Sequence, residues 1–141
     1  MPLLPSPFEE WFAARGWAPR PHQLELVSRA QAGLSTLLIA PTGAGKTLAG
    51  FLPSLVDLTG KPAPKRGGRN TLHTLYISPL KALATDVARN LYAPIAEMSL
   101  PISVETRTGD TPVSRRQRQK TKPPDLLLTT PEQLALLLSH D

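Results

Sequence analysis

The hydrophobic positions of this chain fall into short apolar runs and into longer stretches with helical spacing. The run Thr36–Ala40 is continuous and has the length of a strand, which is typical of a parallel strand covered on both faces. His73–Ile77 and Asp125–Thr129 are also predicted strands, and the second of them is expected to be buried. Ser103–Arg107 is more polar and alternates, so we expect it nearer the edge of a sheet.

Apolar residues at helical spacing precede, separate and follow these runs. Pro21 fits the first turn of a helix, while Gly16 and Gly33 each follow a helical stretch, where glycine often ends a helix. The alternation of strands and helices predicts an α/β fold, with a parallel sheet and helices on both of its faces. The predicted helices cover residues 8–15, 21–32, 46–58, 79–91 and 131–138, with a short basic helix from residue 112.

Three predicted helices begin with a hydroxyl residue followed by proline, at Ser78-Pro79, Thr111-Pro112 and Thr130-Pro131. A hydroxyl side chain is a good N-cap, and the fixed φ of proline suits the first helical position. Thr130 with Gln133 also fits a capping box. Because these helix starts follow parallel strands, we expect them at the carboxyl edge of the sheet, where ligands bind in open α/β folds.

A glycine-rich loop lies between the first apolar run and the helix that begins at Lys46. In such loops, backbone N–H groups and the helix dipole hold nucleotide phosphates. Lys46 would reach the β- and γ-phosphates, and the Thr47 hydroxyl would be a ligand of Mg²⁺. Ala40 stands where the usual motif begins with glycine. The sequence therefore predicts a nucleoside triphosphate site formed by Thr42, Gly43, Ala44, Gly45, Lys46 and Thr47.

Composition narrows the class of protein. The 141 residues allow one domain at most, and 40% hydrophobic with 19% charged residues describe a globular chain. The absence of cysteine excludes disulfides and thiolate metal sites. The chain begins without the basic and apolar regions of a signal peptide, and no apolar run approaches the ~18 residues of a membrane span. We therefore expect a soluble, cytoplasmic protein without a membrane partner.

The net charge of +5 is concentrated in two basic segments. The first, residues 59–71, is rich in Gly, Pro and Lys and is expected to be a flexible insertion loop. The second, residues 107–122, lies between other motifs and favours a surface that attracts polyanions.

Together the motifs resemble the first RecA-like domain of superfamily 2 helicases. The residues within the motifs are most similar to those of the Lhr-type DExH-box group and, within it, of the ligase-associated DNA helicases. The resemblance implies that residues 1–141 are the N-terminal part of an incomplete RecA-like P-loop domain in a longer enzyme. It rests on Gly16-x-x-Pro19-x-x-x-Gln23, Ala40–Thr47, Ile77–Leu83, Arg107–Thr111 and Thr129–Leu134.

The resemblance also implies roles for individual residues. Gln23 would read adenine, because a carboxamide can accept from the exocyclic amine and donate to N7; the alternative is a surface glutamine at a helix start. Trp11 and Trp17 could stack on bases, although packing is the favoured interpretation. The family's contacts to the nucleic-acid backbone, which position a strand without reading its sequence, correspond to Ser78, Leu80, Lys81, Thr108, Gly109, Asp110, Thr130, Glu132 and Gln133.

One defining motif of this family is missing from the chain. No Asp-Glu-x-His follows an apolar strand, and no Asp-Glu pair occurs anywhere. In phosphoryl transfer the acidic strand-end residue helps to hold Mg²⁺, and another group orients the attacking water. We expect those groups, and the arginine finger of a second RecA-like domain, beyond Asp141. The 141 residues alone are therefore expected to lack ATPase activity.

The resemblance implies an ATP-dependent DNA helicase that moves 3′ to 5′ on single-stranded DNA, with ATP and Mg²⁺ as cofactors. Single-stranded or tailed duplex DNA would be its partner, in DNA repair, with a DNA ligase and nuclease system as further partners. Two alternatives remain open at this point. A small P-loop kinase shares the strand, loop and Lys-Thr pattern, and a non-catalytic module could bind ATP or DNA without hydrolysis.

Overall fold

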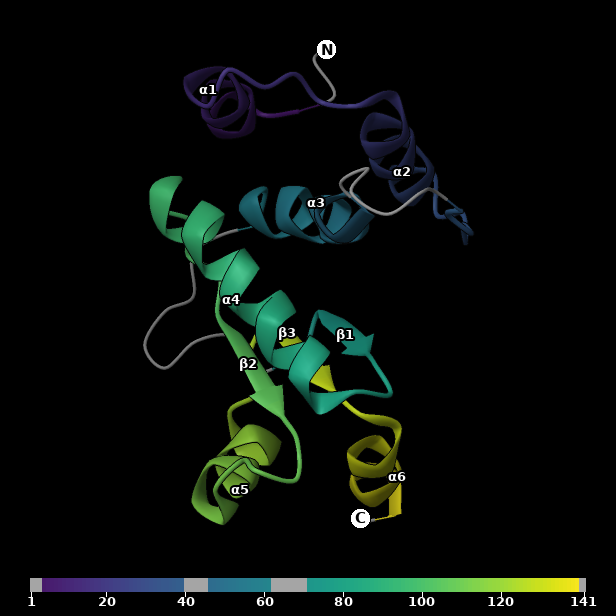
Figure 1. The fold of residues 1–141 in the computed structure, drawn as a ribbon, viewed down its shortest axis with the longest axis vertical. Helices are drawn as coiled ribbons and strands as arrows, with labels where there is room; N and C mark the ends of the chain where they lie inside the picture. Colours follow the sequence, from purple (N-terminus) through teal and green to yellow (C-terminus); the bar gives the residue numbers. More distant parts are fainter. Residues whose placement is uncertain (1–3, 40–45, 62–70, 140–141) are drawn as a thin grey trace. The chain divides into compact units, whose positions relative to one another are not determined.

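The computed structural model describes residues 4–39, 46–61 and 71–139, and the chain divides into two compact units. The first unit contains Met1–Lys61 together with Glu97–Leu100, and the second contains Pro62–Ala96 together with Pro101–Asp141. Figure 1 shows the helices and strands of both units. The expected phosphate loop and most of the expected insertion loop, residues 40–45 and 62–70, lie outside the described residues.

The first unit is helical. It contains α1 (Ser6–Ala14), α2 (Pro21–Gln31) and α3 (Lys46–Thr59), which agree with the predicted helices to within two residues at each end. Gly16 and Gly33 follow α1 and α2 with φ of +69° and +73°, a conformation that glycine adopts without the strain a Cβ would cause. The apolar side chains of this unit that are at most 4% exposed are Leu4, Phe8, Phe12, Val27, Ala49, Phe51, Leu52, Leu55 and Leu58.

The prediction of a strand at Thr36–Ala40 is wrong for the residues that the structure describes, Thr36–Ile39. Residues 34–39 form no regular secondary structure, and Ala40 lies outside the described residues. The side chains of Leu37 and Ile39 are 83% and 86% exposed instead of buried. A strand satisfies its backbone groups only through a neighbouring strand, and none of the strands in the described part of the chain pairs with this segment. The apolar run thus has the pattern of a buried strand without a partner.

The second unit is built on a parallel sheet, as predicted. Its strands are β1 (Thr74–Ile77), β2 (Val104–Arg107) and β3 (Leu126–Thr129), in the order β1-β3-β2. The central strand β3 is buried at all four residues, which requires cover on both faces, and the more polar β2 lies at an edge. Since crossover connections are right-handed, a chain that passes from β1 to β2 and back to β3 places the two connecting helices on opposite faces.

The helices of this unit are α4 (Lys81–Glu97), α5 (Val113–Thr121) and α6 (Pro131–Ser139), with the last residue of α4 counted in the first unit. The helix α4 continues past its expected end at Leu91 and includes Pro94 in its interior. The helix α6 begins at Pro131, so Thr130 stands at the predicted N-cap position and its carbonyl accepts from the amide of Leu134.

The predictions that Ser78 and Thr111 are the N-caps of α4 and α5 are wrong. The helix α4 begins at Lys81, two residues later than predicted, so Ser78 lies before the helix, where its hydroxyl bonds to the backbone of Leu80 in the preceding turn. The helix α5 begins after Pro112, and the Thr111 hydroxyl accepts from the amide of Thr108 at 2.9 Å. Hydroxyl side chains next to strands thus close turns here, which is the competing use of the same chemistry.

Candidate functional site

Lys46 and Thr47 form the first turn of α3, and both side chains are exposed. The first four N–H groups of a helix lack partners within the helix, and the dipole adds positive potential at this end. An exposed ammonium and hydroxyl at that position fit a bound triphosphate and Mg²⁺. The other predicted residues of this site, Thr42, Gly43, Ala44 and Gly45, lie outside the described residues. Their roles, and those of Lys46 and Thr47, stay predictions.

Gln23 is not a surface residue. Its side chain is 3% exposed, and its Oε1 accepts a hydrogen bond from the amide of Arg20 at 2.8 Å. The backbone N–H of Gln23 in turn donates to the backbone carbonyl of Arg20 at 2.9 Å. This reciprocal pair fixes the first turn of α2 and holds the carboxamide in one orientation, so the alternative of a surface glutamine is wrong. The role of Gln23 in reading adenine stays a prediction.

The three strands of the second unit end in register. Ile77, the last residue of β1, is aligned with Thr129 of β3, which is aligned with Arg107 of β2. The three predicted nucleic-acid segments begin at the next residues, Ser78, Thr130 and Thr108. The carboxyl edge of the sheet therefore carries all three segments side by side, as the sequence predicted.

Thr129 connects these strand ends through hydrogen bonds, although no role was predicted for this residue. Its carbonyl accepts from the amide of Ser78 at 3.0 Å, and its buried hydroxyl donates to the carbonyl of Arg107 at 2.7 Å. The loop after β2 is closed by Thr111, whose hydroxyl bonds to Thr108 on one side and to the carbonyl of Thr106 on the other. A hydroxyl residue at the end of a buried strand was the signal available in the sequence.

The nine residues predicted to contact nucleic acid fall into a buried group and an exposed group. The side chains of Ser78, Thr108, Thr130 and Gln133 are buried, and the hydroxyls of Ser78 and Thr108 accept from backbone amides in their turns. Gln133 Oε1 has no hydrogen-bond partner among the described residues, so the predicted capping box with Thr130 is not formed. The residues exposed enough to meet a ligand directly are Leu80, Lys81, Gly109, Asp110 and Glu132.

One ion pair joins two of the predicted segments. Lys81 Nζ lies 3.1 Å from Asp110 Oδ2, and both side chains are largely exposed. An exposed pair of this kind contributes only about 0–1 kcal/mol, so it leaves both side chains available to a ligand. It brings the start of α4 and the loop after β2 together on one rim.

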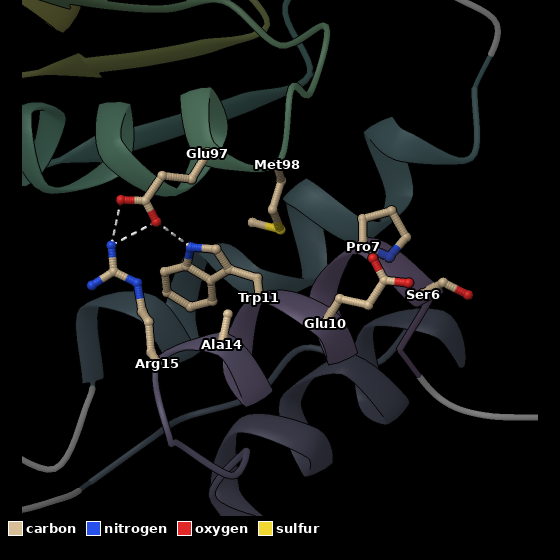
Figure 2. Close-up of a pocket in the computed structure, with 8 residues that line it drawn as sticks. All are labelled: Ser6, Pro7, Glu10, Trp11, Ala14, Arg15, Glu97 and Met98. Atoms are coloured by element: carbon tan, nitrogen blue, oxygen red, sulfur yellow. Dashed lines mark hydrogen bonds and ion pairs between the residues drawn. The ribbon is translucent and has the colours of Figure 1, made fainter.

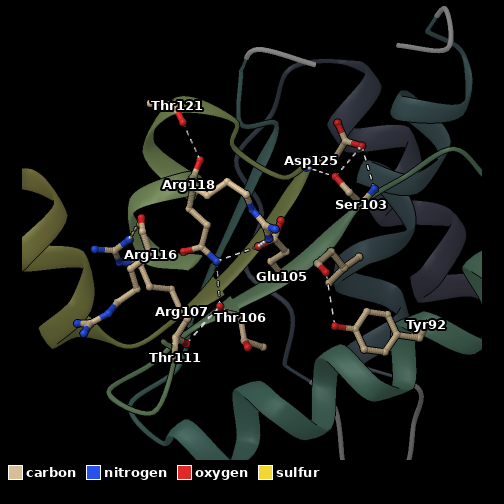
Figure 3. Close-up of polar contacts among 12 residues, drawn as sticks. Tyr92, Ser103, Glu105, Thr106, Arg107, Thr111, Arg116, Arg118, Thr121 and Asp125 are labelled. Carbon is tan, nitrogen blue, oxygen red and sulfur yellow. Dashed lines mark hydrogen bonds and ion pairs between the residues drawn. The ribbon is translucent and has the colours of Figure 1, made fainter. Parts of the chain in front are cut away.

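The basic helix α5 packs against β2 through polar contacts (Figure 3). Arg118 pairs with Glu105 at 3.1 Å, and the buried Gln119 donates to the same carboxylate and to the carbonyl of Thr106. Arg107 donates to the carbonyl of Arg116 at 2.9 Å. At the other end of the sheet, Ser103 just before β2 and Asp125 just before β3 exchange hydrogen bonds. The contacts of α5 with Glu105, Thr106 and Arg107 fix the orientation of this helix along the edge strand.

A separate cavity in the first unit lies beside α1 (Figure 2). Trp11 Nε1 donates to Glu97 at 2.7 Å, and Arg15 donates to the same carboxylate at 2.6 Å. The Arg15 guanidinium also lies over the rings of Trp11 and Trp17. Trp11 is therefore a packing residue, as favoured from the sequence, while Trp17 remains 53% exposed.

Acidification is expected to loosen this contact. The hydrogen bond from Arg15, with that from Trp11, holds the pKa of Glu97 below its ordinary value. A lowered folded-state pKa contributes stability above the unfolded-state value, and this stability is lost as the pH falls through the folded value. We expect the thermal unfolding midpoints of wild type and Glu97→Gln to differ at neutral pH and to converge below about pH 4. Glu25→Gln is the matched control, since among the described residues Glu25 pairs with Arg29 alone, on an exposed helix face. A difference for Glu97→Gln that stays constant with pH contradicts the assignment.

Comparison with known families matches residues 20–141 to the DEAD/DEAH box helicase family. The chain belongs to that family. The RecA-like fold class inferred from the sequence, in an incomplete form, is confirmed by the parallel sheet together with this match. Membership in a helicase family also favours the helicase interpretation over the kinase alternative.

The relatives of this helicase-family chain include Lhr proteins, which confirms the resemblance seen in the sequence. It is 45% identical over 142 residues to "Lhr helicase/ probable uracil glycosylase" of Mycolicibacterium smegmatis, covering 92% of this chain and 9% of that protein. It is 36% identical over 147 residues to "ATP-dependent helicase Lhr-Core" of Methanocaldococcus jannaschii, covering 97% of this chain and 17% of that protein. The chain thus spans a small part of the length of these curated relatives.

Solved helicase structures share the fold of this chain. The Mycobacterium smegmatis helicase Lhr, bound to ssDNA and AMP-PNP, matches with a TM-score of 0.83 at 39% identity, over 97% of this chain and 18% of that one. The DUF1998 helicase MrfA, bound to DNA and AMPPNP, matches with a TM-score of 0.80 at 30% identity, over 95% and 18% respectively. Within the described part of this helicase-family chain, no helix has the length and apolar character needed to cross a membrane.

Proposed function

We propose that this chain is the ATP-binding and DNA-backbone-contacting part of a helicase that moves 3′ to 5′ along single-stranded DNA and serves in DNA repair. The observation that carries the proposal is the common register of Ile77, Thr129 and Arg107, which sets three polar loops on one rim of the sheet. Loops that follow parallel strands in this way suit a run of backbone phosphates. The ssDNA and DNA in the related Lhr and MrfA structures support a DNA ligand.

In this proposal the loop and first turn of α3 hold ATP. The Lys46 ammonium neutralises charge on the β- and γ-phosphates, and the Thr47 hydroxyl holds Mg²⁺, which when bound shields the phosphate charge. Gln23 selects adenine through its carboxamide, whose orientation is fixed by Arg20. These residues bind and orient the nucleotide.

The rim residues act on the DNA strand. Lys81 offers a cation to a phosphate, and the exposed backbone at Gly109 allows close approach of the strand. The buried hydroxyls of Ser78 and Thr108 hold their loops in shape through bonds to the backbone. Contacts of this kind are independent of base sequence, as movement along a strand requires.

The groups that complete hydrolysis are proposed to lie outside this chain. We place the Asp-Glu-x-His strand and the second RecA-like domain after Asp141, and the acidic strand is the proposed partner of Thr36–Ile39. Isolated residues 1–141 are accordingly proposed to have negligible ATPase activity. A DNA ligase and nuclease system is proposed as the functional context on the basis of the family resemblance alone.

The test is DNA-stimulated ATP hydrolysis and unwinding by the full-length protein. We expect single-stranded DNA to stimulate hydrolysis, and a duplex with a 3′ single-stranded tail to be unwound while the same duplex with a 5′ tail is not. Unwinding of the 5′-tailed duplex alone would overturn the polarity. Hydrolysis that is indifferent to DNA and stimulated by RNA would overturn the assignment of DNA as the partner.

A further inference from the structure

Two arginine side chains lie together where β2 meets α5, and neither pairs with a carboxylate among the described residues. Arg107 is the last residue of β2, and its side chain is 4% exposed. Its Nη1 donates to the carbonyl of Arg116, while the Nε atoms of both arginines are buried and have no hydrogen-bond partner among the described residues. Figure 3 shows both side chains beside the basic helix. Of the two guanidinium groups, that of Arg107 thus donates to the backbone of the other arginine.

The charge of this pair is not compensated within the described residues. Burial lowers the pKa of Arg107, and the charge of Arg116 lowers it further. Arginine nevertheless stays protonated in proteins, so the two positive charges persist side by side. The neighbouring Arg118 differs, because it pairs with Glu105 on β2. Buried charges are ordinarily paired, and a buried guanidinium without an anion is therefore an unusual arrangement.

We propose that Arg116, with the buried positive charge of Arg107 beside it, binds a phosphate of the nucleic-acid backbone, in addition to the three predicted loops. The inference rests on the proposed function, whose rim it extends onto α5. A guanidinium presents N–H donors in a planar fork that matches a phosphate, and unused donors are what an incoming anion needs.

The position of the pair favours a nucleic-acid strand over a carboxylate of the protein. Arg107 immediately precedes the predicted contact segment Thr108–Asp110 and lies in register with the other strand ends. The same helix carries Arg115 and Lys120, both exposed and without an ion pair among the described residues. A series of cations along one helix suits the regularly spaced charges of a phosphate backbone better than a single carboxylate.

The experiment measures binding of a fluorescein-labelled single-stranded oligonucleotide to the full-length protein over a range of salt concentrations. Arg116→Gln is the test variant, because Arg116 is only partly buried. Arg89→Gln is the matched control, since Arg89 is an exposed arginine of α4 that pairs with Asp86 within its own helix. We expect Arg116→Gln to weaken binding about tenfold and to lower the slope of log K against log salt by about 0.7. Arg89→Gln should change the affinity by less than about twofold.

A conservative variant separates geometry from charge. Arg116→Lys keeps the positive charge, so it should retain most of the salt slope while binding more weakly than wild type. Equal affinity and slope for Arg116→Gln and Arg89→Gln would overturn the phosphate site. A lowered thermal unfolding midpoint for DNA-free Arg116→Gln, with an unchanged salt slope, would also overturn it and would identify a carboxylate elsewhere in the protein as the partner. If wild type itself fails to bind the oligonucleotide, the proposed function fails together with the site.

Discussion

Replacement of Lys46 by alanine is expected to reduce DNA-stimulated ATP hydrolysis by the full-length protein about 10²–10³-fold, the usual cost of losing a preorganised charge on a developing anion. Lys46 lies in the first turn of α3 with its side chain exposed, where the helix dipole already attracts phosphate. Removing the ammonium leaves the dipole but takes away the group that we propose reaches the outer phosphates. Steady-state hydrolysis at saturating single-stranded DNA measures this loss.

The control for this variant is Lys61→Ala. Lys61 follows the other end of the same helix and forms an exposed pair with Asp57 at 3.4 Å, so the same substitution removes a surface charge without touching the phosphate site. We expect its activity to match wild type within about twofold, as for other exposed ion pairs. Comparable activity of Lys46→Ala and Lys61→Ala would contradict the assignment of Ala40–Thr47 as the phosphate loop.

Substitution of Gln23 by glutamate is expected to raise the KM for ATP about tenfold while the thermal unfolding midpoint stays the same. The carboxylate keeps an oxygen for the amide of Arg20, so the first turn of α2 remains closed. It lacks the N–H that would donate to N7 of adenine. The substitution therefore separates the structural bond of Gln23 from its proposed role in nucleotide recognition.

Discrimination between ATP and GTP provides the second readout for Gln23→Glu. We expect the preference for ATP in kcat/KM to shrink, because a carboxylate can accept from the exocyclic amine of adenine but cannot donate to N7. Gln31→Glu is the matched control, since Gln31 is an exposed glutamine at the far end of the same helix. An unchanged KM and an unchanged ATP preference in Gln23→Glu would leave only the structural role. Gln23→Ala, which also removes the oxygen, should in addition destabilise the fold by about 1 kcal/mol.

The elements that sequence patterns predicted well are those whose stability is decided within a short stretch or by burial on both faces. The strand β3 is an uninterrupted apolar run and proved buried at every residue. The helix α2 begins at Pro21 and is followed by Gly33 in the left-handed conformation, as its sequence signals indicate. In these cases local propensity and tertiary packing favour the same structure.

The failures have a common physical origin in partners that local pattern does not specify. Thr36–Ile39 has the composition of a buried strand, but a strand also needs a neighbour to accept its hydrogen bonds. Ser78 and Thr111 each stand before proline, yet their hydroxyls bond within turns that the sheet edge imposes. A hydroxyl residue next to proline therefore correctly indicated a change of chain direction. It did not indicate which backbone group the hydroxyl would bond.

The same limit applies to the candidate site. Spacing placed the three polar loops on one edge of the sheet, because parallel strands oblige their carboxyl ends to meet. It did not indicate that Lys81 pairs with Asp110, or that Arg107 is buried beside Arg116. Such pairs depend on how far two loops extend from their strands, which is set by turn geometry and not by periodicity.

The hydrogen bonds of Thr129 have a mechanical consequence for the rim. One residue of the central strand accepts from the loop after β1 through its carbonyl and donates to the end of β2 through its hydroxyl. Displacing any one of these loops alone would break a bond at a fully buried residue, which typically costs about 1–3 kcal/mol. If the rim binds a DNA strand as proposed, a force on the loop after β1 would therefore be passed through Thr129 to the end of β2.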